Sequence, residues 1–229
     1  MDLGIKNKVA LVTAASQGLG KASAIELANE GVKLAICSRD QEKINQTADE
    51  IKNLSGAEVL AVKADLDNTD DIENLIKEIE KKFNKVDILV NNTGGPKAGF
   101  FDDLSDEDWL KTFESTFLSA VRVTRKVLPF MKKNKWGRII NISSVSAKQP
   151  IDNLMLSNGV RMSIHGWAKT LSNQVASENI LINNVCPGFT HTERVDALIK
   201  EQVENSNSSP EDIIESIASD IPAKRVGQA

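Results

Sequence analysis

Small residues in the stretch TAASQGLG, positions 13–20, form the first pattern in this 229-residue chain that is suited to ligand chemistry. The stretch follows an apolar run, KVALV, and precedes a segment whose apolar residues have helical spacing. Gly18 and Gly20 let the backbone approach a ligand closely, and amide groups at a helix amino terminus attract a pyrophosphate. A glycine pair before a helix also occurs in tight turns that bind nothing, so the stretch alone leaves both interpretations open.

Alternating apolar and helical segments predict the scaffold that positions this turn. The strand candidates are KVALVT (8–13), KLAICS (33–38), EVLAVKAD (58–65), VDILVNN (86–92), GRIINIS (137–143) and ILINNVCPG (180–188). Continuously apolar strands separated by helices predict a parallel sheet covered on both faces. We therefore expect one α/β domain over residues 1–229, a Rossmann-type doubly wound sheet with ligands at the carboxyl ends of its strands. Gly31 follows the first helical segment, where a left-handed cap is expected.

The composition narrows the classes of partner. Lys and Arg number 28 and Asp and Glu 32, and the net charge of −4 argues against general attraction to nucleic acid or membranes. Cys37 and Cys186 stand in apolar contexts without metal-ligand spacing, so we expect free thiols, no metal site and a reducing cytoplasm. No basic leader with an apolar run opens the chain, and no stretch is apolar enough to span a bilayer.

Four motifs occur together in the order and spacing of one enzyme family. They are TAASQGLG, NNTG (91–94), NISS (141–144) and NNVCPGFTHT (183–192). In these motifs the whole chain resembles the short-chain dehydrogenases/reductases, most closely the 3-oxoacyl-[acyl-carrier-protein] reductases. The resemblance implies a nicotinamide cofactor and hydride transfer between it and a small carbonyl or secondary alcohol substrate, with a 3-oxoacyl compound as one candidate.

The resemblance also implies which residues contact the cofactor. The phosphate turn matches at Thr13, Ser16, Gly18, Leu19 and Gly20. Ala14 replaces the first glycine of the family's turn, and it must take a negative φ or accept strain. The adenine side matches at Asp65 and Leu66, the adenosine ribose side at Asn91 and Gly94, and the nicotinamide loop at Pro187, Gly188, Thr190 and Thr192.

The end of the second strand candidate bears on the choice of cofactor. An NAD enzyme usually places an acidic residue there to bind the ribose hydroxyls, whereas this strand ends in Ser38 and Arg39. A guanidinium suits a 2′-phosphate, so we expect NADP(H) to be favoured over NAD(H). Two observations weaken this prediction. Asp40 follows one position late, and Gln17 stands where NADP-preferring relatives often carry a basic residue. Arg39 as a solvated surface charge is the alternative.

The residues that would transfer a proton depart from the family's pattern. The family uses an Asn, a Ser and a Tyr-x-x-x-Lys. By resemblance these positions fall on Thr116, Ser144, Ser157 and Arg161, and the chain contains no tyrosine. Ser157 cannot act as a poised acid, and Arg161 stays charged. The expected site is therefore electrostatic, with two hydroxyl groups beside a fixed positive charge and water completing proton delivery.

Two histidines are candidates for the acid that a tyrosine supplies in the family. His165 lies one helical turn beyond Arg161, and we interpret it as a packing or interface residue. His191 lies between two positions matched to cofactor contacts, and it is the better candidate, although a surface loop position is the simpler interpretation. A catalytically impaired sensor or scaffold protein that binds NAD(P) is the alternative to an enzyme.

The last third of the chain carries the remaining expectations. A lid-like segment is expected at about 190–222, with a mobile connection in EQVENSNSSPED, 201–212. The sequence IPAKRVGQA, 221–229, matches a point where relatives continue through a helix and an edge strand, so that carboxyl-terminal strand is expected to be absent. Two long helices containing residues 109–128 and 160–176 are expected to form a homodimer, or part of a tetramer if a full carboxyl terminus exists.

Overall fold

A six-stranded parallel sheet forms the centre of the protein. The computed structural model describes residues 1–204, 206 and 208–229. The strands are β1 (Val9–Val12), β2 (Lys33–Ser38), β3 (Val59–Lys63), β4 (Ile88–Asn91), β5 (Gly137–Ile142) and β6 (Ile180–Val185). Their order is β3-β2-β1-β4-β5-β6, and every neighbouring pair is parallel. All six predicted strands and the Rossmann-type topology are confirmed.

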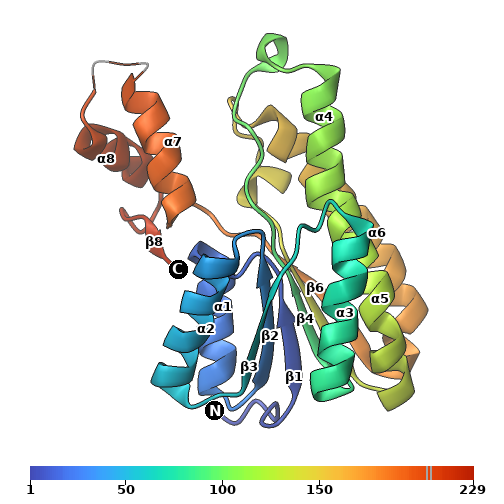
Figure 1. Cartoon of the computed structure of the whole chain (residues 1–229). Helices are drawn as coiled ribbons and strands as arrows, with labels where there is room; N and C mark the ends of the chain where they lie inside the picture. The colour runs from blue at the N-terminus through green and yellow to red at the C-terminus, as the bar shows by residue number, and fades with distance from the viewer. Residues whose placement is uncertain (205, 207) are drawn as a thin grey trace.

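Helices cover both faces of this sheet, as the apolar strands predicted (Figure 1). One face packs against α1 (Gly18–Asn29) and α2 (Gln41–Ser55), and the other against α3 (Thr69–Phe83), α5 (Ser119–Asn134) and α6 (Met155–Val175). Leu34 and Ile44 are fully buried on the first face, and Leu75 and Val127 are fully buried on the second. Gly31, just beyond α1, has φ +75°, so the predicted left-handed cap is confirmed.

A π-helical turn interrupts the helical segment that leads into α5. The segment begins with α4 (Asp106–Thr112), passes through the π turn η2 (Phe113–Leu118) and continues as α5. Short 3₁₀ turns occur at η1 (Phe101–Asp103), η3 (Val145–Ala147) and η4 (Ala176–Glu178). π turns inside helices often lie at functional sites, because the extra residue redirects nearby side chains.

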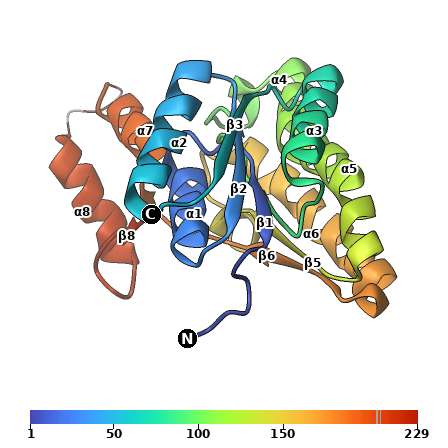
Figure 2. The same cartoon turned by 60° about the horizontal axis from the view of Figure 1, so that its bottom comes forward.

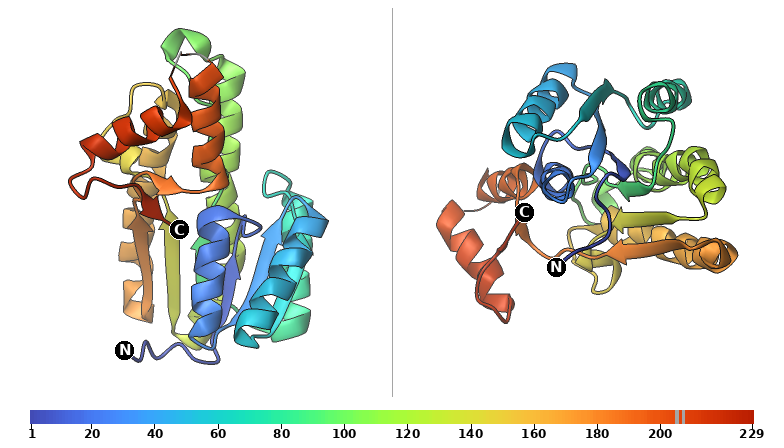
Figure 3. Two further views of the ribbon diagram at one scale, coloured as in Figure 1. Left: turned by 90° about the vertical axis from the view of Figure 1, so that its left-hand side faces the viewer. Right: turned by 90° about the horizontal axis from the view of Figure 1, so that it is seen from below.

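The carboxyl-terminal segment stands at the end of the sheet where the strands finish (Figures 1 and 3). It contains β7 (Thr190–His191), α7 (Glu193–Glu204), α8 (Pro210–Asp220) and β8 (Gly227–Gln228). β7 pairs in parallel with β8, while β6 is the last strand of the main sheet within the described residues (Figure 2). Helices therefore occupy both ends of the expected mobile connection, at 201–204 and 210–212. Between these helices, residues 205 and 207 lie outside the described residues.

None of the helices in the described part of the chain has the length and apolar character needed to cross a membrane.

Candidate functional site

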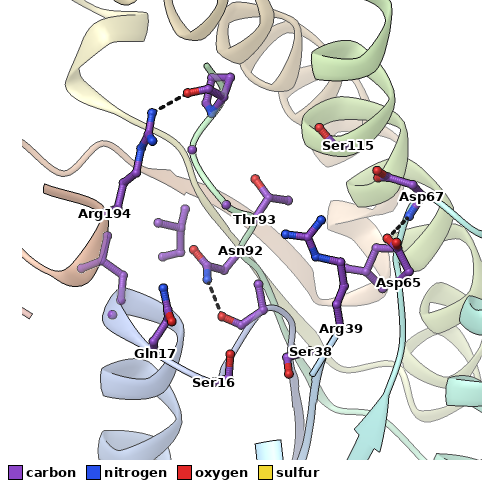
Figure 4. Close-up of a pocket in the computed structure, with 18 of the residues that line it drawn as sticks. Ser16, Gln17, Ser38, Arg39, Asp65, Asp67, Asn92, Thr93, Ser115 and Arg194 are labelled. Atoms are coloured by element: carbon purple, nitrogen blue, oxygen red, sulfur yellow. Dashed lines mark hydrogen bonds between the residues drawn. The ribbon is translucent and has the colours of Figure 1, made fainter. Parts of the chain in front are cut away.

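A pocket of about 700 Å³ opens at the carboxyl ends of the strands (Figure 4). It contains residues that follow β1 and β4, the point where the strand order reverses and where such folds bind ligands. Ten of the residues expected to contact cofactor or substrate line it: Ser16, Gly18, Leu19, Ser38, Arg39, Asp65, Leu66, Gly94, Arg161 and Thr192. Nine others lie outside the lining: Thr13, Gly20, Asn91, Thr116, Ser144, Ser157, Pro187, Gly188 and Thr190.

The turn between β1 and α1 has the close packing that a phosphate cradle requires. Gly18 has φ +53°, and a side chain there would contact Thr192 at 3.4 Å. A Cβ at Gly20 would lie 2.5 Å from the carbonyl oxygen of Ala14, so only glycine fits. Ala14 itself has φ +46°, so it takes the strained alternative of the two that the sequence allowed.

Hydrogen bonds tie this turn to the end of β4. Thr13 Oγ1 donates to the carbonyl of Asn92 at 2.7 Å and accepts from the amide of Asn92 at 2.8 Å. The side-chain amide of Asn92 donates to the carbonyl of Ala14 at 3.1 Å (Figure 4). Thr13 therefore positions the turn from below, which explains why it is buried and does not line the pocket.

The far end of the pocket, beyond β2, is positively charged. Arg39 is exposed there and, within the described part of the chain, forms no hydrogen bond or ion pair. Lys43 lines the same end. Asp40 is already used as a cap, because its carboxylate accepts the amide of Lys43 at 3.0 Å at the start of α2. Asp40 lies one position after the place of the acidic residue that NAD enzymes usually carry, and its carboxylate here caps helix α2.

Two carboxylates face this positive end from the loop after β3. Asp65 and Asp67 both line the pocket, and the backbone amide of Asp67 donates to Asp65 Oδ1 at 3.2 Å. Partial burial, together with the neighbouring charge of Asp65, raises the pKa of Asp67, while Arg39 acts in the opposite direction. Asp65 and Leu66, which the resemblance matched to the adenine contacts, therefore line this end of the pocket.

Arg161 lies at the opposite end of the pocket, and internal hydrogen bonds hold it firmly. Its Nη1 donates to the carbonyls of Ile142 and Ser143, each at 3.0 Å, and its Nε donates to Ser157 Oγ at 3.2 Å. Burial, and secondarily the charge of Arg194, lowers the pKa of Arg161 to about 10. The guanidinium is consequently still protonated at neutral pH.

The two serines expected beside Arg161 occupy different settings. Ser157 is buried, and its hydroxyl is shared between Arg161 and Ser146 Oγ, 2.9 Å away, so it does not face the pocket. Ser144 is half-buried and accepts the amide of Ser146 at 3.1 Å, which leaves its own O–H available to donate. Neither serine lines the pocket, and of the two only Ser144 keeps an O–H that is not already used within the described residues.

Asn91 points into the protein interior. Its side-chain amide donates to Asn141 Oδ1 at 2.9 Å and to Thr124 Oγ1 at 3.1 Å, and Asn141 donates onward to Asn184 at 2.8 Å. These three asparagines are register partners across β4, β5 and β6. The ladder fixes the strand ends beneath the pocket, and the pocket-lining role falls to Asn92.

Thr116 lies within the π turn and is buried. The same helical segment presents Thr112 and Ser115 to the pocket. Ser115 Oγ donates to the carbonyl of Thr112 at 3.4 Å. The predicted position is therefore near the site, but its neighbours face the ligand space.

The loop after β6 supports the pocket from outside. Pro187 accepts the amide of Val145 through its carbonyl at 2.8 Å, and Gly188 accepts Thr190 Oγ1 at 3.2 Å. Only Thr192, at the end of this loop, reaches the lining. Pro187, Gly188 and Thr190 thus shape the loop, while Thr192 closes over the glycine turn.

The histidines take the positions of the simpler interpretations, His165 packed and half-buried and His191 on the surface, but their order as candidates changes. His165 Nε2 lies 2.9 Å from Ser143 Oγ and 3.7 Å from Cys186 Sγ, close beneath Arg161's carbonyl partners. Burial, and then the charge of Lys148, lowers the pKa of His165. His191 is exposed and faces Asp196 at 3.3 Å, outside the pocket. Of the two, His165 is nearer the site.

Several pocket residues were not anticipated from the sequence: Asn92, Thr93, Thr112, Ser115, Ser143 and Arg194. The polar run THTER, 190–194, was the available signal for Arg194, because the loop before it matched a cofactor motif. Its position over the pocket depends on how α7 packs, which local sequence does not specify.

Comparison with known proteins places this geometry in context. The sequence profile of a family described as short chain dehydrogenase matches residues 8–203. The chain is 31% identical over 226 residues to the NADPH-dependent reductase BacG of Bacillus subtilis, covering 98% of this chain and 87% of that protein. It is 33% identical over 224 residues to a 3-oxoacyl-[acyl-carrier-protein] reductase of Synechocystis, covering 96% and 84%. Among solved structures, L-sorbose reductase from Gluconobacter frateurii, complexed with NADPH and L-sorbose, superposes with a TM-score of 0.94 at 29% identity, covering 100% and 87%.

Proposed function

The chain belongs to the short-chain dehydrogenase/reductase family and is an oxidoreductase, and from this premise we propose that it reduces a carbonyl compound with NADPH. The observation that carries the proposal is one continuous pocket from Arg39, past the glycine turn, to Arg161. Its volume of about 700 Å³ is suited to a nucleotide cofactor. The turn fits a pyrophosphate, since its glycines leave no room for side chains where the backbone approaches.

NADPH is favoured over NADH by the charges at the β2 end. The side chain of Arg39 makes no ion pair or hydrogen bond with the described residues and interacts with Asp67 only through its charge. Lys43 also lines this end of the pocket, and Asp40 is occupied as a helix cap. A free guanidinium gains much from a 2′-phosphate and little from a hydroxyl. BacG, named as NADPH-dependent, and L-sorbose reductase, solved with NADPH, support the same choice.

Arg161 and Ser144 supply the protein's part of the chemistry. Bound NADPH would supply a hydride, carrying two electrons, to the carbonyl carbon. Arg161, held by two backbone carbonyls, stabilises the negative charge that develops on the substrate oxygen as the C=O π bond breaks. Ser144 donates a hydrogen bond to that oxygen, and water delivers the proton that completes the alcohol. Arg161 keeps its own proton throughout, because its pKa is about 10.

A sensor without turnover is the competing interpretation, and the family comparisons favour the oxidoreductase. The cofactor assignment is tested by titration of protein fluorescence with NADPH and NADH, on the wild type and on Arg39→Asp. Loss of a charge-assisted contact is worth about 1.5–3 kcal/mol, so the variant should lose at least about tenfold in NADPH affinity. Unchanged NADPH affinity in Arg39→Asp would remove the basis for the cofactor assignment.

The assembly is proposed to be a homodimer through two helical segments. Leu110 and Met162 are 71% and 53% exposed, and Phe113 is partly exposed, on the segments formed by α4 with η2 and by α6. Phe117 and Trp167 join these segments in an edge-to-face contact at 6.2 Å. Exposed apolar side chains gathered on adjacent helices mark association surfaces, and a twofold contact is self-complementary.

We propose a lid role for the carboxyl-terminal segment. Residues 190–222, with α7 and α8, act as a lid over the pocket, because Thr192 and Arg194 from this segment line it.

Both cysteines are free thiols, which supports placement in the reducing cytoplasm.

A further inference from the structure

Arg161 and Arg194 are two arginines that line the same pocket. Arg161 is 7% exposed, and Arg194 is half-buried at the start of α7. The charge of Arg194 contributes to lowering the pKa of Arg161, so the two cations act on one another. Within the described residues neither forms an ion pair. Buried charges in proteins are normally paired, so this arrangement is suited to an incoming anion.

Arg194 is held in place but not neutralised. Its Nη2 donates to the carbonyl of Pro96, and its side chain lies at one edge of the pocket residues drawn in Figure 4. A Cβ at Gly95 would lie 2.7 Å from Arg194 Nε, so the glycine makes room for the guanidinium. The remaining N–H groups of Arg194 have no protein acceptor in the described part of the chain. Burial lowers the pKa of Arg194, and the charge of Glu201 acts in the opposite direction by favouring the charged form.

Two of the other cations that line the pocket, Lys97 and Arg39, have roles of their own. Lys97 pairs with Asp108 at 3.1 Å. Arg39 and the glycine turn account for the cofactor's 2′-phosphate and pyrophosphate, and Arg161 lies at the other end of the pocket. We therefore assign the anion that would bind near Arg161 and Arg194 to the substrate.

A second cavity of about 620 Å³ lies next to the pocket, and its lining includes the carboxylates Asp103 and Glu201. Lys97 lines both cavities, and Val195, the residue after Arg194, lines the second. The second cavity is mainly apolar, with Phe100, Leu154, Phe189, Leu198 and Ile199 in its lining. Arg194 thus stands at the boundary between a charged pocket and an apolar chamber beneath α7.

We propose that the substrate is an oxo acid with an apolar chain. Its carboxylate binds Arg194, its oxo group lies at Arg161, and its chain enters the second cavity. The inference rests on the proposed function: hydride from NADPH goes to the oxo carbon, water supplies the proton to the oxygen, and the products are a hydroxy acid and NADP⁺.

Binding to the NADP⁺-loaded enzyme tests the inference without turnover, because NADP⁺ cannot reduce an oxo group. The probes are 2-oxooctanoate, 4-oxooctanoate and the methyl ester of each, measured by isothermal titration calorimetry. At least one acid should bind about tenfold or more tightly than its ester, the size of effect expected for a charge-assisted contact. Arg194→Gln should reduce this preference to within about twofold, and Arg194→Lys should restore part of it.

Lys200→Gln is the matched control, because it removes an exposed positive charge from the same helix outside both cavities. It should leave the preference for the acid unchanged. Equal binding of both acids and their esters overturns the inference. The inference is also overturned if Arg194→Gln weakens the binding of acid and ester equally, because Arg194 would then serve only to hold the loop at Pro96. A tenfold loss of NADP⁺ affinity in that variant would assign Arg194 to the cofactor instead. If acids bind selectively but NADPH never reduces them, the anion site stands and the proposed function fails.

Discussion

At the scale of single residues, the proposed chemistry relies on a fixed positive charge. The resemblance matches Arg161 to the family's lysine, and its guanidinium is held by the carbonyls of Ile142 and Ser143. Ser157, at the tyrosine position, serves Arg161 and Ser146 and does not face the pocket. Rate enhancement at this site therefore has to come from positioning and electrostatic stabilisation more than from proton transfer by the protein.

This role of Arg161 predicts a distinctive pH profile. Catalysis needs the charged guanidinium, and burial lowers its pKa to about 10, so the rate should fall as pH rises through about 10. A water-exposed arginine keeps its charge up to about pH 12, so it would cause no fall in the rate below that pH. Arg161→Gln should lower kcat by about a hundredfold or more while circular dichroism stays unchanged. Arg125→Gln, an exposed change outside the pocket, is the control. A flat profile to pH 11 in the wild type would contradict this assignment.

At the scale of elements, the strands and the glycine turn followed from sequence because their signals are local. Apolar, β-branched runs predicted all six strands, and Gly31 was correctly expected in the left-handed region. The π turn η2 was not predictable, since one additional residue in a helix hardly changes apolar spacing. Asn91 and Asn92 are adjacent, and side chains alternate along a strand, so a one-residue difference decides which asparagine lines the pocket.

The turn between β1 and α1 carries a strain that can be measured. Ala14 has φ +46°, where a methyl group costs roughly 1–2 kcal/mol, and glycine's greater unfolded-state freedom offsets part of any relief. Ala14→Gly should therefore raise the free energy of unfolding by about 0.5–1 kcal/mol in urea titrations. Lys135→Gly, at φ +48° on the surface, should gain a similar amount. If Ala14→Gly is less stable than the wild type, the turn is not strained.

At the scale of the whole molecule, the site depends on contacts that no local pattern specifies. Arg194 reaches Pro96, 98 positions earlier, only because α7 packs over the ends of the strands. The composition and motifs therefore predicted the fold and ten of the residues that line the pocket. The second cavity and its boundary at Arg194 required the tertiary structure.

The exposed apolar side chains on α4 and α6 predict the assembly. Multi-angle light scattering should report two subunits for the 229-residue chain. Met162→Lys places a charge on a side chain that is 53% exposed, and it should give monomers that remain folded. Leu54→Lys, at 63% exposure on α2, is the matched control and should leave the dimer intact. A wild-type monomer, or a dimer unaffected by Met162→Lys, would reject this interface.

Transfer of deuterium tests most directly whether a site with Arg161 and Ser157 in place of lysine and tyrosine performs hydride transfer. The protein is incubated with NADPH deuterated at C4 of the nicotinamide, each diastereomer in turn, and with the two oxooctanoates and their methyl esters. Mass spectrometry then follows the alcohol products. We predict a single deuterium on the new carbinol carbon, from one diastereomer only, with strong loss in Arg161→Gln. Tight NADPH binding with no deuterated alcohol above the protein-free control would contradict the assignment and indicate a protein that binds the cofactor without turning it over.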